Sequence, residues 1–150
     1  MQIDTEHLHH WMRAIRESKD PMRTMDAFWR GQILSKEWLI TELEKQRSHF
    51  KNWPTVDIHG GWVGVLASML FQSDIYIDKI RSVDIDPKAV NTANEFIASK
   101  EFSSHCSDSV KFLQQQSDLA QVDLFYLDSW DVKWENDLAS AEHHLKEFLA

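Results

Sequence analysis

The sequence has few cysteines, prolines and glycines and no long apolar run, and each shortage excludes a class of protein. Its one cysteine, Cys106, cannot form a disulfide within the chain, and the first residues lack the basic and apolar segments of a secretion signal. These features predict a cytoplasmic protein, with Cys106 as a small buried residue in a strand. The longest apolar run, residues 62–71, is well short of the roughly 18 residues that cross a bilayer, so we expect no membrane helix.

The composition is typical of a folded globular chain: 150 residues, with 43% hydrophobic and 27% charged side chains. These fractions exclude disorder and collagen-like repeats, and the length fits a single core. The net charge is −8, and residues 101–150 hold ten acidic against three basic side chains. Because acidic surfaces repel phosphate backbones, the charge disfavours non-specific nucleic-acid binding.

The first third of the chain has a helical pattern. Helices are predicted over residues 4–18, 22–30 and 35–49, with a break at Asp20-Pro21 and with Ser35 as the N-cap of the last helix. We expect residues 1–52 to form an N-terminal helical cap.

Beyond Pro54, short β-like runs alternate with helical segments. Strands are predicted over residues 55–58, 79–85, 102–106 and 122–128, and the helices that follow them over 62–71, 87–98, 109–116 and 136–150. This alternation is typical of a parallel sheet with right-handed crossovers. The predicted fold class is therefore α/β: a Rossmann-like parallel sheet of about four strands with flanking helices, formed by residues 53–150.

Three of the four glycines lie in the first strand-to-helix turn, His59-Gly60-Gly61-Trp62-Val63-Gly64. In an open parallel sheet this turn commonly holds a ligand, because glycines let the backbone approach it and free helix amides can face it. Asp84 lies at the end of the second strand, where a carboxylate can bind both hydroxyls of a ribose. The spacing favours an adenosine-containing cofactor. Two simpler interpretations stay open: a tight turn without a ligand, and Asp84 as the cap of the next helix.

In two stretches the chain resembles the class I S-adenosylmethionine-dependent methyltransferases: residues 56–67, with the glycine turn, and residues 82–90, Ser82-Val83-Asp84-Ile85-Asp86-Pro87-Lys88-Ala89-Val90. The resemblance implies that the glycines hold the methionine part of the cofactor, Asp84 the ribose, and Asp108 the adenine. His59 departs from the family, which commonly has glycine there. The cofactor-binding residues that the resemblance implies are Asp57, His59, Gly60, Gly61, Trp62, Gly64, Asp84, Ile85 and Asp108.

The implied activity is transfer of a methyl group from S-adenosylmethionine to an acceptor that the sequence does not identify. Such a transfer needs chiefly an aligned nucleophile, and a base when the nucleophile is weak. Asp128 and Asp131 follow the fourth predicted strand, where the family places catalytic or substrate-facing residues. They are candidates for a base or a substrate ligand, and the alternative is that both are ordinary loop acids. No metal site is predicted.

The family's sheet has seven strands, whereas four are predicted here, so the resemblance covers only the N-terminal, cofactor-binding half of the family's fold. Either the chain is a fragment of a longer enzyme, or self-association replaces the missing half. An open fourth strand would expose unpaired backbone and apolar surface, so we expect a homodimer or a partner subunit to cover that edge. Two other functions stay open. One is a non-catalytic or accessory protein that binds S-adenosylmethionine, and the other is an NAD(P)-dependent oxidoreductase, which shares the glycine turn and the ribose acid.

Two further residue groups have a structural and a functional interpretation. Trp62, Trp130 and Trp134 could line a ligand pocket, although core packing is the commoner role of tryptophan. The groups His7-Leu8-His9-His10 and Glu142-His143-His144 lack the spacing of a helical zinc site. We expect both histidine groups to lie on solvated helix faces.

Overall fold

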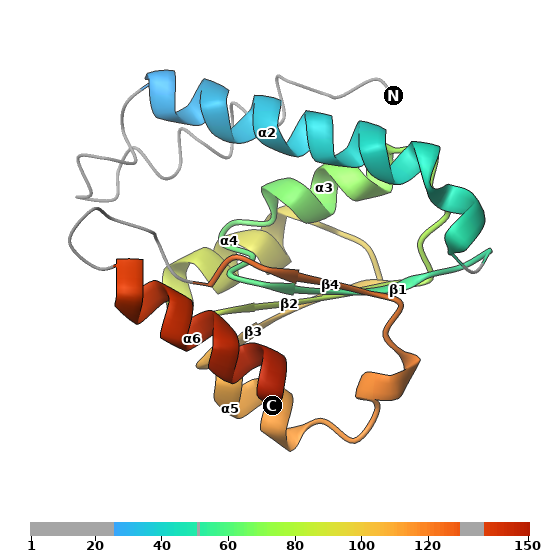
Figure 1. Cartoon of the computed structure of the whole chain (residues 1–150). Helices are drawn as coiled ribbons and strands as arrows, with labels where there is room; N and C mark the ends of the chain where they lie inside the picture. Colours follow the sequence, from blue (N-terminus) through green and yellow to red (C-terminus); the bar gives the residue numbers. More distant parts are fainter. Residues whose placement is uncertain (1–25, 51, 130–136) are drawn as a thin grey trace.

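The computed structural model describes residues 26–50, 52–129 and 137–150 (Figure 1). Its helices are α2 (Asp26–Lys45), α3 (Val65–Gln72), α4 (Pro87–Phe96), α5 (Ser109–Gln115) and α6 (Asp137–Leu149), with short 3-10 turns η2 (Arg47–His49) and η3 (Leu119–Gln121). Its strands are β1 (Thr55–His59), β2 (Lys79–Asp84), β3 (Phe102–Cys106) and β4 (Leu124–Leu127). Within these described ranges, no helix is both long enough and apolar enough to span a membrane.

The four strands form one parallel sheet in the order β3-β2-β1-β4. This arrangement confirms the predicted fold class, a Rossmann-like parallel sheet with helices between the strands. The chain builds the sheet outward from β1 to β3 and then places β4 on the other side of β1. The strand order therefore reverses between β1 and β4, and open α/β sheets bind ligands beside such a reversal, at the carboxyl ends of the strands.

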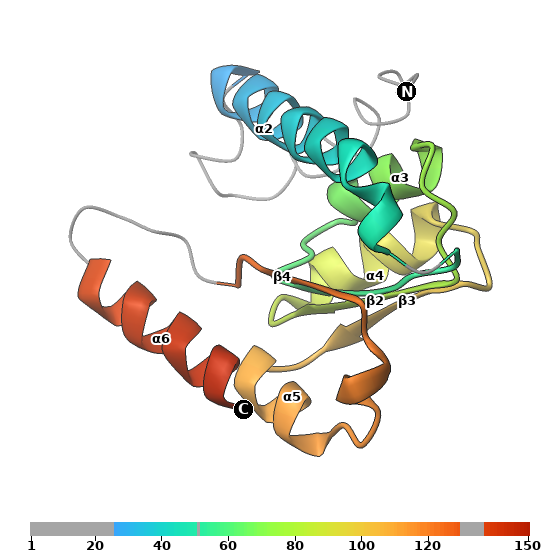
Figure 2. The ribbon, with the colours of Figure 1, turned by 45° about the vertical axis from the view of Figure 1, so that its right-hand side comes forward.

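Side chains of β1 alternate between the two faces of the sheet, as the pleat requires. Val56 and Ile58 pack in the apolar core with α3, whereas Asp57 and His59 contact residues on the side of α5 and α6. Figures 1 and 2 show the two helical layers on opposite sides of the sheet, with α2 lying outside α3.

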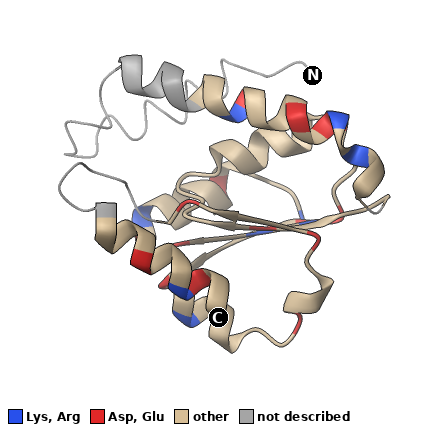
Figure 3. Cartoon of the chain, viewed as in Figure 1, with Lys and Arg blue, Asp and Glu red and all other residues tan. Residues whose placement is uncertain are grey.

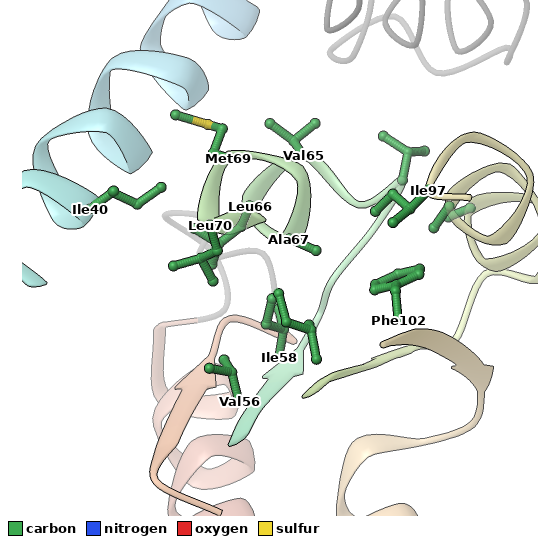
Figure 4. Packing of buried hydrophobic residues seen from close by; sticks show 14 residues of the cluster. Ile40, Val56, Ile58, Val65, Leu66, Ala67, Met69, Leu70, Ile97 and Phe102 are labelled. Atoms are coloured by element: carbon green, nitrogen blue, oxygen red, sulfur yellow. The ribbon is translucent and has the colours of Figure 1, made fainter. Parts of the chain in front are cut away.

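The apolar core lies between the sheet and α3, and α2 contributes to it. Figure 4 shows Leu66 and Leu70 of α3 above Ile58 of β1, with Ile40 of α2 approaching the Met69 side of α3. Ile40 and Met69 are both fully buried. Helix α2 therefore shares its core with the sheet.

The separate helices predicted over residues 22–30 and 35–49 are wrong, because residues 26–45 form the single helix α2. Ser35 lies inside this helix and does not cap it. Packing of Ile40 against α3 holds the segment helical, and such tertiary contacts routinely outweigh a local capping preference. The predicted helix over residues 4–18 lies outside the described residues.

The other elements follow the predictions to within a few residues. Helix α3 starts at Val65, later than predicted, because Gly64 has left-handed backbone angles (φ 87°) that cannot continue a helix. Helix α4 begins at Pro87, and the side chain of Asp86 caps it by accepting a hydrogen bond from the Lys88 amide.

Charged residues of both signs lie on α2, α4 and α6, whereas α3 carries none (Figure 3). Four charged side chains in the described part of the chain are buried: Lys36, Asp57, Arg81 and Glu147. Burying a charge without a partner is costly, so each of these needs a structural explanation.

Candidate functional site

The glycine turn lies between the carboxyl ends of β2 and β4. The amides of Gly60 and Gly61 donate to the carbonyl of Val83 in β2, at 2.8 and 3.1 Å. On the other side, the amide of Asp128 donates to the carbonyl of His59 at 2.8 Å. Three strand ends therefore meet around this turn.

The turn depends on glycine at position 60. Gly60 has a φ of 81°, and a Cβ on it would lie 2.0 Å from the carbonyl oxygen of Asp128. Two residues later Trp62 adopts a φ of 49°, a region that non-glycine residues rarely enter. Such local strain concentrates at ligand sites and needs the surrounding structure to maintain it.

Asp84 points toward the glycine turn. Its Oδ2 accepts a hydrogen bond from the Trp62 amide at 2.8 Å, and its Oδ1 accepts one from the Asp86 amide at 2.9 Å. The cap of the following helix is Asp86, so the interpretation of Asp84 as that cap is wrong. Asp84 is partly exposed, and each carboxylate oxygen can accept a second hydrogen bond.

The amides of the turn are less available than the sequence suggested. Those of Gly60, Gly61 and Trp62 all donate to β2, so the Trp62 amide, at the predicted start of the helix, is not a free helix amide. The first bond into the helix runs from the Ser68 amide to the Gly64 carbonyl. The amides at the start of α3, from Val65 on, therefore form its positively polarised end.

An exposed apolar side chain stands beside Asp84. Ile85 is 72% exposed, although it directly follows a buried strand. Cys106 ends the adjacent strand opposite Asp84, and its Sγ lies 3.7 Å from the Ile85 carbonyl. The prediction of a buried Cys106 is wrong, because the residue lies at the last position of the edge strand β3 and is exposed.

Asp57 and His59 lie beneath the turn, on the side of the sheet that faces α5 and α6. Arg81 binds both oxygens of Asp57, with Nε at 3.0 Å from Oδ1 and an Nη at 2.7 Å from Oδ2. The same guanidinium reaches Asp118 and stacks on the ring of Phe112. Asp57 is thus fully buried in a bidentate ion pair.

His59 belongs to a chain of buried polar contacts. Its Nδ1 lies 2.8 Å from Oγ of Ser109, which donates to Glu147. A serine oxygen that donates to a carboxylate can accept from the imidazole, so this geometry favours a proton on Nδ1. Burial lowers the pKa of His59 below its usual 6.5, and the charges of Asp57 and Glu147 partly oppose that effect.

Glu147 connects this chain of contacts to α6. Its Oε1 lies 2.6 Å from Nδ1 of His144 and 3.6 Å from Nε2 of His143. His143 in turn lies 2.6 Å from Oγ of Ser129, just beyond β4. The expectation of a solvated face for His143 and His144 is wrong, because their side chains are only 14% and 30% exposed.

Asp108 caps α5 by accepting a hydrogen bond from the Lys111 amide at 3.0 Å. It follows β3 at the same edge of the sheet as Asp84, where the resemblance places the adenine acid. The cap occupies one of its oxygens, and the side chain is partly exposed.

Asp128 follows β4 and is exposed. The hydroxyl of Tyr126 donates to its Oδ2 at 3.3 Å. Burial raises the pKa of Tyr126 to about 12, and the nearby Asp128 charge adds to the shift. Lys36 of α2 also interacts with Asp128: burial lowers the pKa of Lys36, and the Asp128 charge partly offsets that effect. Asp131 lies outside the described residues.

Sequence reasoning missed both Lys36 and Tyr126. The position of Tyr126, two residues before Asp128 on the same face of a strand, was a usable signal. Lys36 carried none, because only the packing of α2 on α3 brings it to the sheet edge. Trp130 and Trp134, predicted as possible pocket residues, are not among the described residues.

Within the described ranges, no three His, Cys, Asp or Glu side chains are grouped so that they could hold a metal ion. A depression lined by Asp78, Lys79, Lys100, Glu101, Phe102 and Ser103 lies at the amino ends of β2 and β3. It is at the opposite end of the strands from the glycine turn and contains none of its residues.

Three solved structures are similar to this chain. A SAM-dependent methyltransferase from Archaeoglobus fulgidus has 16% identity and a TM-score of 0.44, with 75% of this chain and 48% of that chain covered. A mutant of MtNAS has 14% identity and a TM-score of 0.49, with 91% and 49% covered. Human N-acetylserotonin methyltransferase in complex with SAM has 17% identity and a TM-score of 0.43, with 96% and 44% covered.

This chain spans about half the length of those three proteins. At such low identity the likeness concerns the fold alone. No protein-family model matches the chain, and no curated protein matches it in sequence.

Proposed function

We propose that the carboxyl edge of the sheet binds S-adenosylmethionine and that the protein transfers its methyl group to an acceptor. The observation that carries this proposal is the position of Asp84, whose carboxylate lies against the glycine turn and keeps acceptor capacity on both oxygens. A ribose has two neighbouring hydroxyl groups, and a carboxylate with two free acceptor positions can accept a hydrogen bond from each of them.

The residues around Asp84 fit the rest of the cofactor. Ile85 offers an exposed apolar side chain to the adenine ring, and Asp108 stands at the end of the next strand for its amino group. The glycine turn and Trp62 lie where the methionine part would bind. Asp57 and His59 act beneath the turn as its supports, since their side chains are buried and engaged by Arg81 and Ser109.

When bound, S-adenosylmethionine supplies a methyl group that is already activated by the positive sulfur. The protein then has to align the acceptor and, for a weakly nucleophilic acceptor, remove its proton. Asp128 is the candidate base: an acceptor proton would move to its carboxylate, which the Tyr126 hydroxyl orients and which interacts electrostatically with Lys36. Asp131 remains a second candidate.

Isothermal titration with S-adenosylmethionine and with NADH tests the cofactor of the proposal, and release of S-adenosylhomocysteine in the presence of an acceptor separates methyl transfer from binding alone. We expect binding of S-adenosylmethionine only. Binding of NADH alone would support the oxidoreductase, and binding of neither would favour a protein that has the fold without the cofactor.

Cys106 offers a second, independent readout. It is the one cysteine of the chain, it is exposed, and it lies next to Ile85. We expect S-adenosylmethionine to slow its reaction with a thiol reagent, because the adenine would cover it. An unchanged labelling rate at saturating cofactor would contradict this placement of adenine.

A matched pair of substitutions locates the site. Asp84→Ala should weaken binding by about 1–3 kcal/mol, the cost of leaving buried hydrogen-bond partners unpaired. Asp78→Ala removes an exposed carboxylate just before the other end of the same strand and should leave the affinity unchanged. Equal effects of the two substitutions would show that Asp84 does not contact the ligand.

A further inference from the structure

Helix α6 turns its polar side toward the protein and its apolar side toward solvent. Ser140 and Glu147 are 2% and 3% exposed, and the side chains between them contact Ser129 and Glu147. On the opposite side, four large apolar residues are 56% to 80% exposed: Leu138, Leu145, Phe148 and Leu149. A surface helix normally has the reverse arrangement.

We call these four residues the α6 stripe. Leu138, Leu145 and Leu149 are spaced by seven and four positions, so they lie in one line along the helix. Phe148 adds a fourth exposed apolar side chain to this helix, and contiguous exposed apolar surface often marks an interaction site on a soluble protein.

The stripe lies near the open border of the sheet. Strand β4 is one of the two edge strands of the sheet, and in the described part of the chain it pairs only with β1. Phe125 of β4 is 40% exposed and lies 6.4 Å, ring to ring, from His59, on the side of the sheet that α6 covers. His143 of α6 lies 2.6 Å from Oγ of Ser129, two residues after β4, so α6 lies near the end of this edge strand and packs beside α5 (Figure 2).

We propose that the α6 stripe binds a second copy of this chain, with the two α6 helices packed antiparallel about a twofold axis. Such a contact is self-complementary, because the same surface serves both copies. The charges beside the stripe have the required symmetry: Glu142 and Lys146 are both exposed and lie one turn apart. In an antiparallel pair, Glu142 of each copy lies beside Lys146 of the other.

The free edge of β4 also favours a second copy of this chain as the partner. An edge strand can pair antiparallel with its own copy about a twofold axis normal to the sheet, and that axis also brings the flanking helices together antiparallel. One symmetry operation thus covers both the stripe and the edge. The contact is independent of the proposed cofactor site.

Sedimentation of the full chain over a concentration series tests the proposal. A helix pair of this size buries less than a standard interface of about 1,600 Å², so we expect a dimer that dissociates in the micromolar range. Leu145→Asp places a charge in the middle of the stripe and should weaken association at least tenfold. Leu149→Asp should act in the same direction at the end of the stripe.

A charge exchange tests the antiparallel orientation. Glu142→Lys and Lys146→Glu should each weaken the dimer, and the double variant should restore it, with circular dichroism to confirm equal helix content. Tyr76→Asp is the matched control, because Tyr76 is 70% exposed in the connection between α3 and β2 and should leave the dimer intact. A chain that stays monomeric at several hundred micromolar, or a dimer that tolerates both stripe substitutions, would overturn the proposal.

Discussion

Replacement of Arg81 by methionine tests how the buried carboxylate beneath the glycine turn is stabilised. Methionine keeps an aliphatic side chain at this position but removes the guanidinium, which binds both oxygens of Asp57 and lies over the ring of Phe112. The Asp57 side chain is 1% exposed, so the substitution leaves a carboxylate buried without its partner. Removing one partner of a buried ion pair costs about 3–5 kcal/mol, and we expect Arg81→Met to lower the free energy of unfolding by that amount.

The double variant Asp57→Leu with Arg81→Met separates the burial of a lone charge from the loss of packing. With both charges gone, most of the stability should return, so the two effects should be strongly non-additive. Asp118→Ala is the control at the other end of the guanidinium. Asp118 is 41% exposed, and exposed ion pairs contribute about 0–1 kcal/mol.

Urea unfolding at neutral pH, followed by tryptophan fluorescence and circular dichroism, provides the measurement, since a single domain of this size should unfold in one transition. A loss below about 1 kcal/mol for Arg81→Met, within the range of an ordinary surface ion pair, would refute the reasoning. So would a double variant whose loss equals the sum of the single losses.

Three further outcomes follow from the geometry. Gly60→Ala should cost about 2 kcal/mol or more, because its Cβ would overlap the Asp128 carbonyl at a positive φ; calorimetry that finds the variant as stable as wild type would contradict this. In a Tyr76→Phe background, Tyr126 is the one remaining tyrosine and should ionise near its pKa of about 12, and Asp128→Asn should lower that midpoint in an absorbance titration. Because this folded pKa lies above the unfolded value of 10.0, the contribution of Tyr126 to stability should be lost as pH rises from about 10 to 12. The pKa of His59 is lowered by burial, so the unfolded chain takes up a proton first and stability should fall as pH drops below about 6.5; His59→Gln should flatten that dependence, and an equally steep profile in the variant would count against it.

The elements of the sheet were predictable because their signals are local. Short β-like runs between helical segments marked the four strands, and Asp86-Pro87 marked the start of a helix through its cap and its fixed φ. The glycine turn was equally readable, since Gly60 meets a steric requirement of its own backbone. Asp84 could be assigned to the end of the second strand from the number of residues that separate it from that turn in the sequence.

Contacts between distant parts of the chain were not predictable. Asp57 looked like a ligand residue, yet its partner Arg81 lies 24 positions away and only strand pairing brings the two together. Glu147 and Ser109 are 38 positions apart and meet where α6 packs against α5. The orientation of α6, with its polar side toward the protein, likewise cannot be recognised from the sequence pattern. Amphipathic periodicity tells which residues share a face of a helix, but not which face is turned inward.

The sequence by itself determined the order of strands and helices, the class of fold and the place of the glycine turn, since each follows from interactions among near neighbours. Only the tertiary structure decided that the amides of Gly60 and Gly61 donate to β2, that Tyr126 donates to Asp128 while Lys36 interacts with its charge, and that α6 leaves its apolar face in solvent. These contacts depend on which surfaces of the chain pack together. Packing decides which charged and apolar groups are buried, and burial sets the free energy of each such group.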